Sequence, residues 1–111
     1  MSILSKRRLQ LKKRYYEIAF EKTNKAVTLL YSYGAREVYI FGSLTKPDLF
    51  DEMSDVDIYV KGLSKENRKG LFTKMEEIFG NVKFDLFFDD DVLRPDIATK
   101  IEREGKLWKS S

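Results

Sequence analysis

The segment from Phe41 to Val60 reads FGSLTKPDLFDEMSDVDIYV and joins two strand-like runs through a loop. The first run ends in the pair Gly42-Ser43, and eleven residues of loop follow. Asp55 and Asp57 then flank a single valine at the head of the second run. In a strand, residues i and i+2 point to the same face, so these two carboxylates project together with Cα atoms about 6.6 Å apart. The segment therefore predicts a cluster of negative charge near a glycine-containing turn.

Two neighbouring carboxylates without Lys or Arg beside them in the sequence need a raised pKa or a bound cation. Hard divalent cations such as Mg²⁺ prefer carboxylate oxygens and keep positions open for substrate phosphates. Gly42 lets a phosphate approach the backbone, and Ser43 offers a hydroxyl and an amide donor. We therefore predict a metal and phosphate site formed by this turn and the two aspartates.

A third carboxylate, Asp85, lies in the apolar run VKFDLFF at 82–88, where burying a lone charge would be costly. If this run forms a strand next to the one after Asp55, three carboxylates meet in one pocket. That is enough to hold two metal ions about 3.5–4 Å apart, an arrangement suited to in-line displacement at phosphorus. Placement of Asp85 on the opposite side of the sheet would remove the site.

The order of a Gly-Ser pair, a loop, Asp-x-Asp on a strand and a single Asp on the next strand resembles the nucleotidyltransferase superfamily that includes DNA polymerase beta. The short chain resembles its minimal branch, whose members are antitoxin partners of HEPN-domain toxins. The resemblance covers Val38 to Trp108, and the run from Ile101 to Trp108 is similar to the closing segment of that branch. The loop between Ser43 and Asp55 is one residue longer than is usual there.

This resemblance implies transfer of AMP from ATP to a tyrosine of a HEPN-type toxin, which silences the toxin. Asp55 and Asp57 would bind two Mg²⁺ ions, and Asp85 would ligate the ion nearest the acceptor and assist its deprotonation. Gly42 and Ser43 would hold the triphosphate. Taken singly, the Gly-Ser pair is typical of an ordinary turn and each aspartate of a solvated surface. Order and strand context together favour a site.

The composition excludes several kinds of chemistry. The 111 residues contain no cysteine and no histidine, so disulfide scaffolds, thiolate zinc sites, catalytic triads and imidazole bases are absent. Hydrophobic residues make up 42% of the chain, enough for one core. We expect a single domain over residues 1–111, with a basic N-terminal helix at 1–33 and a catalytic core at 35–108. No apolar run reaches membrane-spanning length, so we expect a soluble, cytoplasmic protein.

Charge is distributed unevenly along the chain. Of the 21 basic residues, six lie at 6–14, and the first fourteen residues contain no acid. Fifteen basic residues therefore face all 18 acidic ones in the remainder, which is net −3 against +6 for the arm. The pattern favours a solvated basic helix over a specific nucleic-acid site. Two alternatives to an enzyme remain: an antitoxin that acts only by occluding its partner, and a nucleic-acid-binding protein that uses residues 6–14.

The predicted fold is α/β, a small mixed sheet with helices packed mainly on one face and a long N-terminal helix. Ser64 is expected to cap the second helix, Ile97 and Ile101 to pack inward from the last one, and Asp89–Asp91 to form a solvated helix cap. The expected elements are helices at 5–33, 64–79 and 95–104, and strands at 37–41, 55–60 and 82–88. The segment 44–54 is expected to be a mobile loop, either a lid over nucleotide or a plain surface loop.

Overall fold

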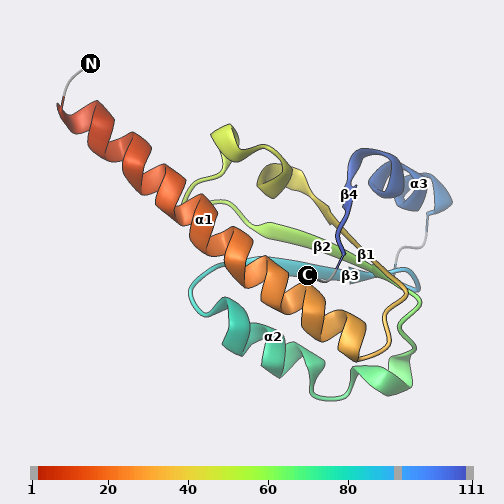
Figure 1. Ribbon diagram of the computed structural model, residues 1–111. Coiled ribbons are helices and arrows are strands. Elements are labelled where there is room, and N and C mark those ends of the chain that lie inside the picture. The colour runs from red at the N-terminus through yellow and green to blue at the C-terminus, as the bar shows by residue number, and fades with distance from the viewer. Residues whose placement is uncertain (1–2, 92–93, 110–111) are drawn as a thin grey trace.

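The computed structural model describes residues 3–91 and 94–109 (Figure 1). The helices are α1 (Ile3–Ser32), α2 (Leu71–Phe79) and α3 (Pro95–Glu104). The strands are β1 (Glu37–Phe41), β2 (Val56–Lys61), β3 (Phe84–Phe88) and β4 (Lys106–Leu107). Three short 3-10 turns, η1 (Gly42–Thr45), η2 (Pro47–Leu49) and η3 (Lys65–Arg68), lie in the connections.

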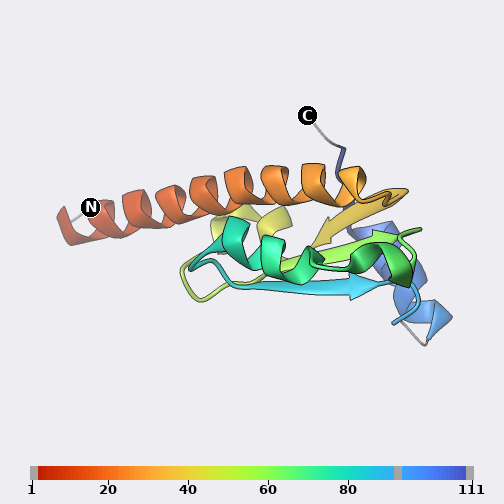
Figure 2. The same cartoon turned by 90° about the horizontal axis from the view of Figure 1, so that it is seen from below.

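The strands form one mixed sheet in the order β3-β2-β1-β4. β1 is antiparallel to both β2 and β4, whereas β2 and β3 are parallel. Parallel neighbours need a crossover, and α2 supplies it between β2 and β3. α1 and α2 cover one face of the sheet, and α3 lies at one end of the other face (Figure 2). The predicted fold class and the predicted β-α-β linkage are confirmed.

The hydrophobic core lies between the sheet and the helix pair α1 and α2. The strand residues facing it are apolar and fully buried, as the two-residue period requires: Val38, Ile40, Val56, Ile58 and Val60. α1 meets them with small or branched side chains: Ala19, Thr23, Ala26, Val27 and Leu30. The Lys22 ammonium donates to the carbonyl of Phe79 at 2.8 Å, which ties α1 to the C-terminal end of α2.

The first helix is continuous from Ile3 to Ser32. Only its second half packs on the sheet, and the first half extends past it (Figures 1 and 2). Side-chain burial is described from Gln10 onward, and within that range the first buried residue of α1 is Ala19. Leu11 and Tyr15 are exposed. In the described part of the chain, no helix combines the length and the apolar character needed to cross a bilayer.

The prediction of one helix from Ser64 to Phe79 is wrong. Residues 65–68 form η3, and Gly70 then takes a left-handed conformation with φ of 74°, so α2 begins only at Leu71. The Arg68 guanidinium donates to the Leu63 carbonyl and pairs with Asp90 at 2.9 Å. These contacts hold the turn in place of a continuous helix. The third strand also starts later than predicted, at Phe84.

Asp89 and Asp90 do not cap α3. The Gly62 amide donates to Asp89, and Asp90 pairs with Arg68, so these acids join the ends of β2 and β3. The residue before α3 is Arg94, which makes no side-chain cap. Inward packing is also wrong for Ile97, whose side chain is 43% exposed, whereas Ile101 is half-buried. α3 contributes no buried residue to the core.

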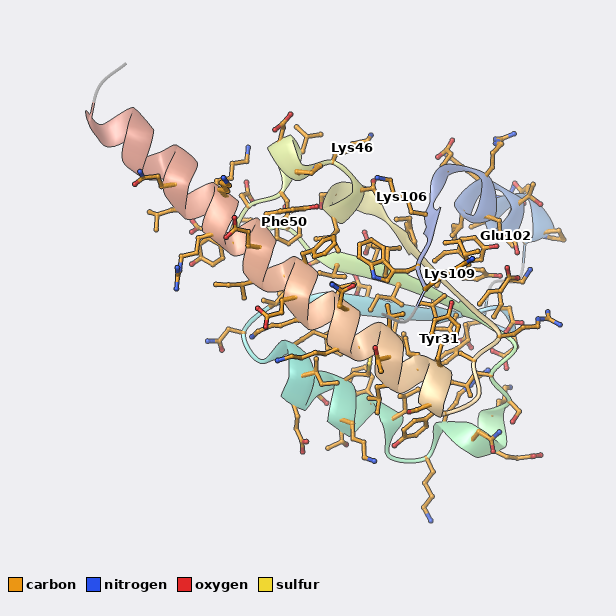
Figure 3. All side chains as sticks on the ribbon, viewed as in Figure 1. Tyr31, Lys46, Phe50, Glu102, Lys106 and Lys109 are labelled. Atoms are coloured by element: carbon orange, nitrogen blue, oxygen red, sulfur yellow. The ribbon has the colours of Figure 1, made fainter. Side chains whose placement is uncertain are left out.

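Near the end of the described chain, Trp108 packs back against α1. Its ring lies 5.1 Å from that of Phe20, and its indole N–H donates to the Asn24 side chain at 2.6 Å. The hydroxyl of Tyr31, which Figure 3 labels near the end of α1, donates to the Trp108 carbonyl at 2.6 Å. Leu107, by contrast, is exposed.

Candidate active site

Asp57 and Asp85 lie side by side on the sheet face opposite the helix pair. The parallel register of β2 and β3 pairs the two residues directly. Paired residues of neighbouring strands point to the same side, and their neighbours Val56 and Phe84 face the core. The arrangement that would have removed the site, with Asp85 on the opposite side, does not occur.

Asp55 precedes the first residue of β2 and is half-buried. It lies close enough to Asp57 for the two carboxylates to repel each other, and Asp85 repels Asp57 as well. Burial, then Asp85, then Asp55 raise the pKa of Asp57 from 3.8 to about 6. Among the described residues, none of the three carboxylates has a hydrogen bond or ion pair. The structure thus brings three negative side chains into one field without a cation to balance them.

Gly42 lies against the Asp57 carboxylate. Its φ of +76° belongs to the left-handed region that favours glycine, and a Cβ built there would collide with an Asp57 carboxylate oxygen. The register of β1 and β2 explains the approach, since Phe41 pairs with Asp57 and Gly42 follows directly. Only glycine fits here without moving the carboxylate. The sequence signal for this position is the glycine that ends β1.

Ser43 lies in η1, the turn that begins at Gly42. The Thr45 hydroxyl donates to the Gly42 carbonyl at 2.6 Å, and the Lys46 amide donates to the Ser43 carbonyl at 2.9 Å. The carbonyl groups of Gly42 and Ser43 are therefore satisfied within the turn. No described residue accepts a hydrogen bond from the Ser43 hydroxyl, which is half-buried. The turn can therefore offer Ser43 as a donor to an anion beside the aspartates.

The loop at 44–54 is anchored at two points rather than being plain irregular chain. Leu44 and Phe50 are buried in the core cluster, and η1 and η2 occupy the stretch between them. The Phe50 ring packs edge-on against Tyr16 of α1 at 6.1 Å, and Figure 3 shows it beside that helix. Buried side chains fix both ends of the turn segment, which positions Ser43 relative to β2. The exposed parts of the loop are residues 46–49 and 51–53, on either side of Phe50.

The donor set suits a hard divalent cation by chemistry, because it consists of three carboxylates with no basic partner. Within the described residues, however, no group of three His, Cys, Asp or Glu side chains is already arranged to hold a metal ion. Sharing one ion therefore requires the aspartate side chains to turn toward one another. The metal-binding and catalytic roles of Asp55, Asp57 and Asp85 stay predictions, as does phosphate binding by Gly42 and Ser43.

A cavity of about 500 Å³ adjoins the aspartates and was missed from the sequence. Gly42 belongs both to its wall and to the Asp57 contact. Its apolar wall comes from three elements far apart in the chain: Phe41, Phe87, Ile97 and Ile101. The available signal was the alternation that places Phe87 on the same face of β3 as Asp85. What the sequence does not show is that α3 closes the cavity.

Comparison with known proteins gives a likeness to a solved structure. No family model matches the chain, and no curated protein does either. Among solved structures, one similar chain is a candidate nucleotidyltransferase from Sulfolobus solfataricus. It is 24% identical, with a TM-score of 0.50, and the match covers 91% of this chain and 86% of that one. At this identity the likeness establishes the fold, and the chain therefore has a nucleotidyltransferase fold.

Proposed function

We propose that the protein is a metal-dependent nucleotidyltransferase that transfers AMP from ATP to a hydroxyl acceptor. The main support is that Asp57 and Asp85 are paired directly across β2 and β3, and that Gly42 packs against the Asp57 carboxylate. Three unbalanced carboxylates and an adjacent turn with a free serine hydroxyl suit a cation that carries a polyphosphate. The fold shared with the Sulfolobus solfataricus protein is consistent with this chemistry.

In this proposal, Asp55, Asp57 and Asp85 would hold two Mg²⁺ ions, and the ions would neutralise the charge that develops on the phosphates. Gly42 and Ser43 hold the triphosphate through the backbone and the serine hydroxyl. Asp85 is more exposed than Asp57, so an acceptor reaches it more easily. We therefore propose that Asp85 accepts the proton of the acceptor hydroxyl.

The acceptor oxygen forms a bond to the α-phosphorus of ATP, and the bond from that phosphorus to the α-β bridging oxygen breaks. Pyrophosphate leaves with the electron pair of that bond. The acceptor proton passes to Asp85 and from there to solvent. The reactants bring all the atoms that are exchanged. The chain therefore has to position the reactants, help to neutralise the charge on the phosphates and deprotonate the acceptor hydroxyl, and carboxylates and hydroxyls can do this without histidine or cysteine.

The acceptor that we propose is a tyrosine of a HEPN-type toxin. The support is the sequence resemblance, together with the exposure of Asp85 on a sheet face that no helix of the described residues covers at this end. A protein acceptor needs such an approach, because a tyrosine on a folded partner cannot enter a closed cavity.

The test incubates the full chain with Mg²⁺, ATP labelled at the α-phosphorus and a HEPN-domain protein encoded beside it. We expect label on the partner, and we expect Asp57→Asn to reduce labelling about a thousandfold because several kcal/mol of charge stabilisation is lost. Asp96→Asn is the matched control, since that carboxylate is exposed at the start of α3. Labelling that survives Asp57→Asn would refute the mechanism. Neutralisation of the partner without any labelling would instead favour a binding module.

A further inference from the structure

We propose that the cavity next to Gly42 binds the nucleobase and ribose of the nucleotide, so that this small chain recognises its nucleotide without an added domain. The inference rests on the proposed function, because it places the base of the nucleotide whose phosphates lie at the aspartates. The cavity has a volume of about 500 Å³, within the range of small-molecule sites.

The cavity shares Gly42 with the candidate active site. Gly42 contributes to its lining and at the same time lies against the Asp57 carboxylate. Phe41, another lining residue, pairs with Asp57 across β1 and β2. A ligand in the cavity and a phosphate beside Asp57 are therefore neighbours. A nucleotide has this form, with a flat apolar end joined to a charged one.

The apolar wall suits a flat aromatic ring. Phe41 and Phe87 project from the two strands that flank β2, and their ring centroids are 5.9 Å apart. Phe87 is 39% exposed and Ile97 of α3 is 43% exposed, so both keep apolar surface that the protein itself does not cover. Every base has a π-face, and stacking on an aromatic side chain is a common way to hold one.

Charge at the rim suits the other end of a nucleotide. Lys46 follows η1 and Lys100 projects from α3, and both line the cavity (Figure 3 labels Lys46). Within the described residues, neither ammonium has an ion pair. Glu104 also lines the cavity, so two ammonium groups against one carboxylate leave the lining net positive. A net positive lining beside an apolar wall matches a ligand that joins a ring to phosphates better than it matches a lipid chain or a plain apolar peptide.

α3 is positioned closely enough to serve as the second wall. A Cβ on Gly105 would come within 3.2 Å of the Ile40 carbonyl oxygen, so the end of α3 approaches the backbone of β1 closely. Glu102 of α3 forms an ion pair with Lys61 of β2. These contacts explain why Ile97 and Ile101 are held over the sheet without being buried in it. The gap they leave is the cavity.

The test compares ATP with inorganic tripolyphosphate, each titrated with Mg²⁺ into the full chain by calorimetry. Phe87→Ala should weaken ATP binding by about ten- to a hundredfold, the usual range for loss of one base stack, and leave tripolyphosphate binding unchanged. Ile97→Asp should act in the same way, and an acid in the first turn of α3 favours the helix, so this variant should fold. Phe72→Ala is the matched control, because Phe72 is a 58% exposed ring with one aromatic neighbour, Phe84, on the other side of the molecule.

The outcomes separate this inference from the proposed function. ATP affinity that is unchanged in both Phe87→Ala and Ile97→Asp would overturn the nucleobase site but leave the nucleotidyltransferase. Equal losses for ATP and tripolyphosphate would also overturn it, since the cavity would then act on the phosphates. Failure of the unmodified chain to bind either compound would overturn both proposals.

Discussion

The two faces of β2 carry alternate residues of one strand and differ in almost every property. Val56, Ile58 and Val60 point toward α1 and α2 and are fully buried. Asp57 points the other way, beside a second carboxylate and a glycine. One face therefore stabilises the fold by removing apolar surface from water, and this lets the opposite face carry charges that repel one another.

On the outer face, burial by α3 decreases along β2 from Tyr59 to Asp57. Tyr59 is buried where α3 crosses, and burial together with nearby Glu102 raises its pKa. Asp57, two residues earlier, lies where that cover ends. A helix that covers only part of a sheet face leaves an edge at which a site can be both partly dry and open to a partner. Substitutions on the two faces should therefore have different consequences.

The largest effect on stability is expected on the inner face. Ile58→Ala removes a fully buried side chain under two helices and should lower the free energy of unfolding by about 3 kcal/mol. Chemical denaturation measures the loss. Asp85→Ala, on the outer face of the neighbouring strand, is the control and should not destabilise the protein, because Asp85 is exposed and repelled by its neighbours. A larger loss for Asp85→Ala than for Ile58→Ala would reverse the assignment of the two faces.

A smaller effect is expected where the outer face meets the turn. Gly42→Ala forces a left-handed backbone on an alanine and also drives a methyl into the Asp57 carboxylate, which together should cost about 2 kcal/mol. Gly70→Ala is the matched control. Its φ of +74° is nearly the same, but a Cβ there meets nothing within 4 Å, so it should cost only about 1 kcal/mol.

The difference between these two glycine variants isolates the contact with Asp57. Thermal unfolding measures it, and calorimetry with Mg²⁺ and ATP shows whether the displaced carboxylate weakens binding. Equal destabilisation by both substitutions would mean that the approach of Gly42 to Asp57 has no energetic weight.

The inner face is the part that the sequence predicts well. Alternating apolar residues in 37–41 and 55–60, and the helical stripe ending at Phe79, each follow a period that one burial direction imposes. For the site, the meeting of the carboxylates was predicted only on the condition that their strands are neighbours. The parallel register of β2 and β3 meets this condition for Asp57 and Asp85, whereas Asp55 precedes β2 rather than belonging to it.

The outer face was predicted less well, because its structure depends on contacts between distant segments. Ile97 has the spacing of a core residue, yet α3 is held over the sheet by Gly105 and Glu102, and this leaves Ile97 exposed. Arg68 similarly holds the turn before α2 by pairing with Asp90, twenty-two residues away. No local periodicity encodes such pairings, so the cavity that they produce stayed hidden.

Without divalent cations, the outer face should show its repulsion as a pH dependence. The pKa of Asp57 is raised to about 6, so the folded state binds this proton more tightly than the unfolded chain does. Stability should therefore fall as the pH rises from about 4 to about 6, and stay lower above that range. Asp57→Asn removes the repelled charge and should raise the free energy of unfolding at pH 8 by about 1 kcal/mol, after allowance for solvent screening.

This gain should shrink as the pH falls below the unfolded pKa of 3.8, where Asp57 becomes protonated in both states. Denaturation curves with a chelator present, at pH 3.5 and pH 8, measure the change. Mg²⁺ should then stabilise the unmodified protein at pH 8 and have little effect on Asp57→Asn. If Asp57→Asn is no more stable than the unmodified chain at pH 8, the carboxylates do not repel one another as inferred.

The smallest effect concerns the attachment of α3, the helix that partly covers the outer face. Its ion pair from Glu102 to Lys61 is half-buried, so Glu102→Gln should cost about 0.5–1 kcal/mol and the loss should shrink in high salt. The control is Asp96→Asn, which removes a pair between Arg94 and Asp96 whose side chains are 72% and 64% exposed and should change nothing measurable. Because α3 contributes no buried residue, this pair orients the helix more than it stabilises the fold. Glu102→Gln should therefore weaken ATP binding at the cavity clearly while lowering the melting temperature only slightly. A variant that loses stability but keeps full ATP affinity would show that α3 does not form the nucleobase wall.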